Sequence, residues 1–167
     1  MSDDNVFRLL IGEIEAKGFK VVGIQEVMPQ ILFSDDYLGK TKPSKDDYED
    51  IKIGIKVARG LGELDVGQAC VVQEGIILAV EAREGTDSML SRVPALRRKG
   101  NAPIMIKVVK PGQDSRVDLP VIGPNTLEAL IKNGIKGIAV DKGGTILLEK
   151  EKLLEMADKY KIFVAGV

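Results

Sequence analysis

The sequence contains no histidine and only one cysteine, Cys70, among its 167 residues. The absence of histidine excludes Ser-His-Asp and Cys-His catalytic pairs, histidine proton shuttles and histidine-ligated zinc. A single cysteine excludes intrachain disulfides and cysteine-rich metal sites, and with no histidine to activate it we expect a buried, inert thiol. Catalytic chemistry in this chain must therefore use carboxylates, lysines, hydroxyls, backbone amides or a hard metal ion bound by oxygen ligands.

The chain also lacks a strong net charge and a long apolar run. Its 24 Lys and Arg residues against 25 Asp and Glu residues give a formal charge of −1, which argues against nucleic-acid binding. No apolar run approaches the roughly 20 residues needed to cross a bilayer. The polar, acidic segment Met1–Asn5 does not resemble a signal peptide. These features predict a cytoplasmic protein with no nucleic-acid partner.

The spacing of apolar residues predicts helices that alternate with strands. Helices are expected over 4–17, 45–62, 87–98 and 124–134 and around Leu153–Ala157, and strands over 19–24, 68–73, 76–82, 104–109, 138–140, 145–148 and 162–165. Such interleaving predicts an α/β fold with a mixed sheet covered by helices. The strands 68–73 and 76–82 are almost wholly apolar and meet at a tight turn, so we expect both to be central in the sheet.

Helix ends and loops can be predicted from a few residues. Ser44 with Asp47 three residues later is typical of a helix N-cap, and Pro124 suits the first position of a helix. Thr86 is expected to cap the helix over 87–98. The segment 29–43 is predicted to be a loop or linker and marks a candidate domain boundary.

Polar side chains lie at the ends of the predicted strands. Gln68 begins one strand, the segment Glu84-Gly85-Thr86-Asp87 follows the next, and Lys107 and Lys110 flank the end of a third. Gln113 follows Lys110 in a polar loop. Ligands of α/β sheets usually bind beyond the carboxyl ends of strands, so these residues predict a ligand site.

The segment 84–87 combines two kinds of ligand-binding group. Its glycine permits close approach of a ligand, and the start of the following helix offers free amides to a phosphate. Glu84 and Asp87 could instead bind Mg²⁺. An ordinary helix cap with an acidic first turn is the alternative.

Three charged residues within apolar segments need a partner or solvent. The amine of Lys107 should either face water or neutralise a buried anion. Glu81 requires a cation, hydrogen-bond donors or a metal if it is buried, or else faces solvent on an edge strand. Asp118, which precedes Leu119-Pro120, could be held rigidly or could belong to a turn. From the residues alone the chain is an α/β domain with an oxygen-and-lysine site suited to phosphate chemistry.

Several segments resemble the LpxI-type UDP-2,3-diacylglucosamine pyrophosphatases. The resemblance lies in 64–68, 71–82, 84–90, 110–114, 116–120 with Ile122-Gly123, and 162–167. It covers the catalytic C-terminal domain of that family from about residue 39 to the end. Residues 2–32 are similar to the last helix and strand of the family's N-terminal domain. The resemblance therefore implies a division into residues 1–38, a remnant of an N-terminal domain with a linker, and residues 39–167, the catalytic domain.

The resemblance implies a metal-dependent hydrolase of lipid A biosynthesis. Such enzymes cleave UDP-2,3-diacylglucosamine to UMP and lipid X (2,3-diacylglucosamine 1-phosphate) by attack of water on the α-phosphorus, with Mg²⁺ as the expected ion. The essential aspartate of the family falls on Asp118, which we expect to bind the metal or activate water. Glu84 and Asp87 are the other expected metal ligands. Gln68, Thr86, Lys107, Lys110 and Gln113 are the expected substrate-binding residues, the two lysines on their position alone.

The resemblance also implies partners. The substrate is a nucleotide-linked lipid, so peripheral contact with the inner membrane is expected. The apolar face of the helix over 4–17 predicts self-association, or association with a chain that carries an N-terminal domain. Two alternatives to catalysis are a module that binds the nucleotide-lipid without turnover and a subunit that needs such a partner.

Overall fold

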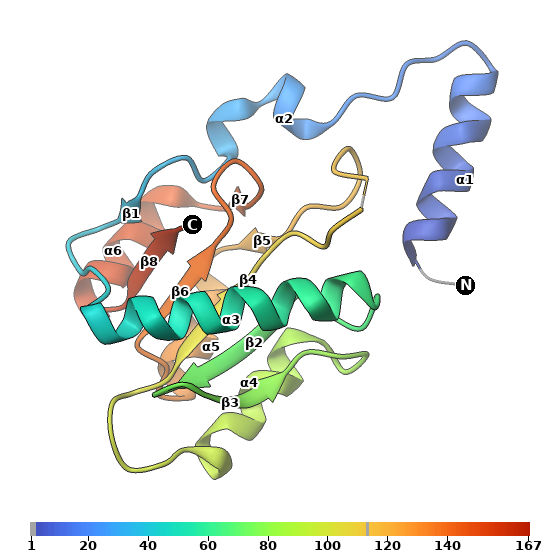
Figure 1. Cartoon of the computed structure of the whole chain (residues 1–167). Coiled ribbons are helices and arrows are strands. Elements are labelled where there is room, and N and C mark those ends of the chain that lie inside the picture. Colours follow the sequence, from blue (N-terminus) through green and yellow to red (C-terminus); the bar gives the residue numbers. More distant parts are fainter. Residues whose placement is uncertain (1–2, 113) are drawn as a thin grey trace.

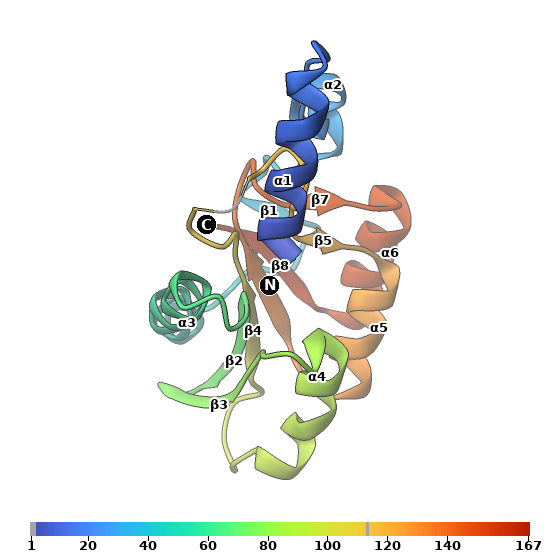
Figure 2. The same cartoon turned by 90° about the vertical axis from the view of Figure 1, so that its right-hand side faces the viewer.

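The computed structural model describes residues 3–112 and 114–167, which form three layers with a mixed sheet in the middle (Figures 1 and 2). The main sheet has six strands in the order β1 (Tyr37–Leu38), β8 (Phe163–Gly166), β6 (Gly137–Val140), β4 (Ile104–Lys107), β2 (Ala69–Gln73) and β3 (Ile76–Val80). One face is covered by α3 (Lys45–Glu63), and the other by α4 (Gly85–Leu96), α5 (Pro124–Lys132) and α6 (Lys150–Tyr160). The predicted α/β class is confirmed.

The strand directions place one edge of the sheet where ligands usually bind. β4, β6 and β8 are parallel neighbours, and β2 pairs with β4 in the antiparallel sense, with Ala69 opposite Lys107. A short parallel pair, β5 (Val121–Ile122) and β7 (Ile146–Leu147), lies outside the main sheet. The carboxyl ends of the three parallel strands therefore meet at one edge.

The hairpin of β2 and β3 forms where it was predicted. Its turn residues Glu74 and Gly75 have φ of 49° and 80°, which the two central positions of a tight hairpin turn require. The prediction that both strands are central is wrong for β3. β3 is the edge strand and exposes Ile76, because the chain leaves the sheet after Val80 to form α4 and no further strand of the described residues pairs with it.

Alternation along the strands divides the core into two clusters. Cys70, Val72 and Ile106 pack against α3, whereas Val71 and Met105 pack against α4, α5 and α6. Cys70 is fully buried, where its thiol donates to the carbonyl of Gly54 at 3.4 Å. Burial raises the pKa of this thiol to about 12, so the prediction of an inert cysteine is confirmed.

The helix starts follow the predicted signals, with one exception. The hydroxyl of Ser44 accepts from the Asp47 amide at 3.2 Å and caps α3, and Pro124 is the first residue of α5. The predicted cap by Thr86 is wrong, because α4 already begins at Gly85 and Thr86 lies within its first turn.

The N-terminal segment extends away from the sheet (Figure 1). The predicted helix forms as α1 (Asp3–Ala16), but the predicted strand 19–24 does not: residues 19–23 have no regular structure, and α2 (Ile24–Val27) and the 3₁₀ turn Pro29–Ile31 follow. Among residues 3–112 and 114–167 no strand pairs with this segment, so its β-forming residues cannot satisfy their backbone groups as a strand.

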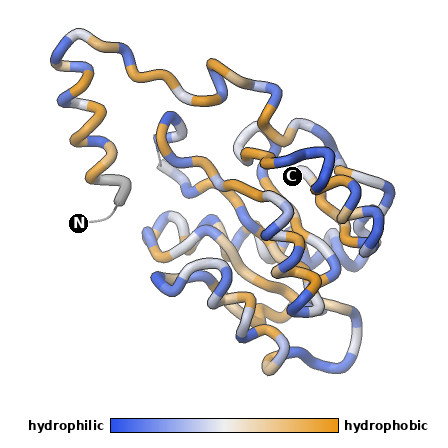
Figure 3. Tube along the Cα trace, turned by 180° about the vertical axis from the view of Figure 1, so that it is seen from behind, coloured by the Kyte–Doolittle hydropathy of each residue, from blue (hydrophilic) through white to orange (hydrophobic). Residues whose placement is uncertain are grey.

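α1 carries hydrophobic residues along its turns, which are orange in Figure 3, and several of them are exposed. Leu9 and Leu10 are 61% and 55% exposed. α1 is tied to the rest of the chain by Arg8, which donates to the carbonyl of Gly112, and by Glu15, which lies 2.8 Å from Arg116. None of the helices over residues 3–112 and 114–167 has both the length and the apolarity needed to cross a bilayer.

Candidate functional site

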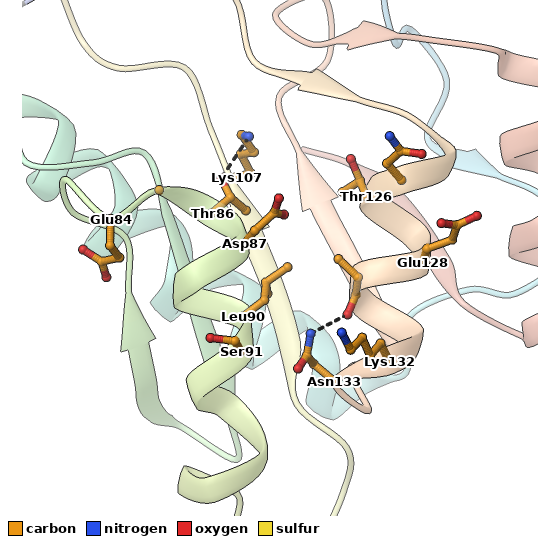
Figure 4. A pocket seen from close by; sticks show the side chains of 13 residues that line it. Glu84, Thr86, Asp87, Leu90, Ser91, Lys107, Thr126, Glu128, Lys132 and Asn133 are labelled. Carbon is orange, nitrogen blue, oxygen red and sulfur yellow. Dashed lines mark hydrogen bonds between the residues drawn. The ribbon is translucent and has the colours of Figure 1, made fainter.

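A hollow of about 740 Å³ lies between α4 and α5, with Lys107 at the end of β4 (Figure 4). Its walls come from the first two turns of α4 and from α5. The lining residues are Glu84, Gly85, Thr86, Asp87, Leu90, Ser91, Lys107, Asn125, Thr126, Glu128, Ala129, Lys132 and Asn133. The hollow therefore lies at the carboxyl end of a sheet strand, where the sequence predicts a ligand.

The hollow combines several features that attract anions. The first turns of α4 and α5 both line it, through Thr86 and Asn125 among others. The first amides of a helix have no partner within the helix, and the helix dipole makes this end positive. Lys107 adds a full positive charge between the two helices. The carboxylates of Glu84, Asp87 and Glu128 also line the hollow, so the groups that could bind a phosphate or diphosphate are Lys107 and the first amides of the two helices.

A buried carboxylate lies behind this hollow. Glu81 is only 7% exposed and follows β3 directly. Its Oε1 accepts from the hydroxyl of Thr86, and its Oε2 accepts from the Gln68 amide at 3.0 Å. Lys107 Nζ in turn donates to Thr86 Oγ1 at 3.3 Å. The sequence left open whether Glu81 is buried with a partner or faces solvent, and the structure shows it buried and bonded to donors. Lys107 is linked to this buried anion through the hydroxyl of Thr86.

Two of the three expected metal ligands line the hollow, but they point differently. The carboxylate of Glu84 points away from Asp87 in Figure 4, and one of its oxygens lies 2.7 Å from an Arg92 nitrogen. Asp87 lies on the hollow side of α4. Within the described part of the chain, no three His, Cys, Asp or Glu side chains are gathered closely enough to hold a metal ion. These residues therefore do not form a preformed metal site.

Asp118 lies outside the lining of this hollow, in the segment that leads into β5. Its amide donates to the Asp114 carbonyl at 3.3 Å, and the residue is half-buried. Its neighbour Leu119 lines a second hollow of about 530 Å³, which also includes Asp141. Asp141 follows β6 and accepts from the Val109 amide at 2.7 Å. Asp118 thus belongs to the loop that borders the carboxyl edge of the parallel strands.

The same loop is fixed by an ion pair between Asp114 and Arg116. The guanidinium of Arg116 contacts both carboxylate oxygens, at 2.6 to 3.1 Å. The hydrogen bonds from Arg116 lower the pKa of Asp114 to about 2. Arg116 also binds Glu15 on α1, so one side chain joins this loop to the N-terminal helix.

The remaining expected site residues lie elsewhere or outside the described residues. Lys110 Nζ is 3.1 Å from Asp65 and lines a small separate hollow with Arg8. Gln68 contributes its backbone amide to Glu81, whereas its side chain does not line the hollow between α4 and α5. Gln113 lies outside the described residues.

The structure thus brings Glu84, Thr86, Asp87 and Lys107 together, and adds a wall that the sequence did not reveal. That wall consists of Asn125, Thr126, Glu128, Lys132 and Asn133 of α5. The sequence predicts the start of this helix at Gly123-Pro124. The spacing of its residues does not indicate that α5 lies near residues 84–87. The two helices become neighbours because they cover the same face of the sheet.

Known proteins are similar to the part of the chain that contains these residues. A family model described as the LpxI C-terminal domain matches residues 34–165. A curated protein of Caulobacter vibrioides, "UDP-2,3-diacylglucosamine pyrophosphatase LpxI", is 39% identical over 171 aligned positions. The alignment covers 99% of this chain and 61% of that relative, so the chain spans about three fifths of the relative's length.

Proposed function

Because this chain belongs to the LpxI family, we propose that it hydrolyses the pyrophosphate bond of UDP-2,3-diacylglucosamine in lipid A biosynthesis. Water attacks the α-phosphorus, and the bond from that phosphorus to the bridging oxygen breaks. The water oxygen stays with UMP, and the bridging oxygen leaves with lipid X. The similarity to a pyrophosphatase supports this reaction, and the chemistry of the hollow is compatible with it.

The position of Lys107 carries the proposal. Its ammonium lies at the end of β4 between the first turns of α4 and α5, in a hollow large enough for a diphosphate. Fixed donors of this kind stabilise the charge that develops on phosphate oxygens as the bond breaks. We assign Lys107 and the first amides of the two helices to the leaving phosphate.

Asp118 is the residue that we propose to accept the proton of the attacking water. The assignment comes from the resemblance of Arg116–Pro120 to the family motif. Asp118 itself lies outside the lining of the hollow, in the loop beside the carboxyl ends of the parallel strands. The ion pair of Asp114 with Arg116 lies in the same loop, and a general base must come within hydrogen-bond reach of the attacking water.

Magnesium dependence is a separate part of the proposal. The described carboxylates do not form a preformed ligand set. Mg²⁺ is usually bound by one or two carboxylates together with substrate phosphates, and the position of Asp87 on the hollow side of α4 supports its assignment to such binding. When bound, the ion would neutralise phosphoryl charge.

We also propose that the chain works in the cytoplasm at the surface of the inner membrane. The substrate carries two acyl chains, which stay in the lipid phase if the enzyme approaches from the surface. Binding of the chain to vesicles that contain the substrate, compared with vesicles that lack it, tests this part of the proposal.

Release of UMP from UDP-2,3-diacylglucosamine tests the reaction. We expect release by the wild type, loss of release with EDTA, and loss with Asp118→Asn while the circular dichroism spectrum is unchanged. Asp46→Asn, which changes an exposed carboxylate at the start of α3, is the control and should keep the activity. Thermal stabilisation by the substrate without release of UMP would instead support a binding module.

A further inference from the structure

We propose that Glu81 is a positioning residue for Lys107 and acts through the hydroxyl of Thr86. The three side chains form one line of hydrogen bonds that begins in the hollow at Lys107 and ends at the buried carboxylate of Glu81. The inference rests on the proposed phosphate chemistry of the hollow and assigns a role to residues behind it.

The direction of the hydrogen bonds follows from the groups involved. A lysine ammonium can only donate, and an ionised carboxylate can only accept. Thr86 must therefore accept from Lys107 and donate its single proton to Glu81. Because this proton is committed to Glu81, Thr86 cannot donate it to a phosphate. Thr86, expected from the sequence to bind substrate, is better placed to orient Lys107.

The far end of the line is fixed. The Oε2 of Glu81 accepts from the Gln68 amide at 3.0 Å, and the Glu81 amide donates to the Ala69 carbonyl at 2.9 Å. Gly67 allows the backbone to pass close to Glu81, because a Cβ there would lie 2.2 Å from the Glu81 carbonyl oxygen. Glu81 is thus a buried carboxylate, bonded to the Gln68 amide, that can orient the hydroxyl of Thr86.

The near end of the line faces the ligand space. Within the described part of the chain, Lys107 Nζ donates one hydrogen bond to a side chain, to Thr86 Oγ1. One of the three ammonium protons is used in this bond, and two remain for an anion in the hollow. The negative charge of Glu81 also offsets the cost of holding a lysine in a half-buried site. Both effects prepare Lys107 for a phosphate before the ligand arrives.

The test uses inorganic pyrophosphate as the probe, with affinity measured by calorimetry on the full chain. Glu81→Gln and Thr86→Val should each weaken binding about tenfold, the size expected for one charge-assisted hydrogen bond. The double variant should also lose about tenfold, because both changes interrupt the same line. Thr86→Ser keeps the hydroxyl and should restore most of the affinity.

Asp50→Asn is the matched control. Asp50 is another buried carboxylate that holds the same hairpin, but it does so at the opposite end, where it accepts from the amides of Glu74 and Gly75 at 2.9 and 2.6 Å. Its replacement should lower thermal stability and leave pyrophosphate affinity unchanged. If Glu81→Gln does not fold, the comparison of Thr86→Val with Thr86→Ser decides the question.

The outcomes separate this inference from the proposed function. Pyrophosphate binding with the expected dependence on Glu81 and Thr86, but without UMP release from the lipid substrate, supports the positioning role and contradicts hydrolysis. UMP release with unchanged affinity in Glu81→Gln and Thr86→Val contradicts the positioning role alone. Additive losses in the double variant, or a wild type that does not bind pyrophosphate, also overturn it.

Discussion

The carboxylate of Asp47 lies 2.5 Å from the ammonium of Lys136, which joins the first turn of α3 to the residue before β6. The same carboxylate accepts from the amide and the hydroxyl of Ser44, both at 2.8 Å. Burial raises the pKa of Asp47, but the bond to Lys136 and the bonds from Ser44 outweigh it, so the pKa lies below its usual value. One side chain therefore caps α3 and attaches it to the sheet.

This ion pair predicts a pH-dependent contribution to stability. Because folding lowers the pKa of Asp47, the contribution is complete above the ordinary carboxyl pKa and is lost as the pH falls through the folded-state value. Asp47→Asn should lower the free energy of unfolding by about 1–3 kcal/mol at pH 7. The difference in the free energy of unfolding between this variant and wild type should shrink in acid. Urea unfolding at pH 7 and at a pH below the folded-state pKa of Asp47 measures it. A difference that does not depend on pH would contradict this account.

A pair of glycine substitutions tests the close approach of two chain segments. In Gly67→Ala the new Cβ would meet the carbonyl oxygen of Glu81, so we expect a loss of roughly 1–3 kcal/mol. Gly60→Ala, within α3, meets no atom within 4 Å and should stabilise the chain by roughly 0.5–1 kcal/mol. Thermal unfolding measures the change in stability of both variants. Changes of the same sign and size would contradict the close approach of Gly67 to Glu81.

The anion site depends on the charge of Lys107. Lys107→Met keeps an unbranched side chain only one atom shorter but removes the charge, and should lower pyrophosphate affinity roughly 10- to 100-fold. Lys99→Met changes an exposed lysine in the loop after α4 and is the control. Calorimetric titration of both variants gives the comparison. Equal affinity in Lys107→Met and wild type would place the diphosphate elsewhere.

The exposed face of α1 predicts self-association. Val6, Leu9 and Leu10 are all exposed, and burying a leucine in an interface gains about 1.5–3 kcal/mol. Light scattering should give a mass above the 18.1 kDa of one chain, and Leu9→Glu should reduce it. Glu13→Gln changes the same helix without touching the apolar residues and should have no effect. A wild-type mass of one chain at all concentrations tested would contradict the prediction.

The sequence by itself determined the features that depend on neighbouring residues. The cap at Ser44, the helix start at Pro124 and the turn at Glu74-Gly75 are local, because each uses backbone groups within a few residues. The inert character of Cys70 also follows from its apolar neighbours. The motif around Asp118 indicated the family from the sequence alone.

Only the tertiary structure decided which distant groups meet. β-forming residues at 19–23 remain unpaired and β3 becomes an edge strand, because strand formation depends on a partner that local sequence does not specify. Thr86 serves Glu81 and Lys107 rather than capping α4, since the register of β2 and β4 brings Lys107 opposite Ala69. α5 joins the site because it packs beside α4 on one face of the sheet. Burial of a shared core decides which helices become neighbours, and the spacing of residues along the chain does not predict it.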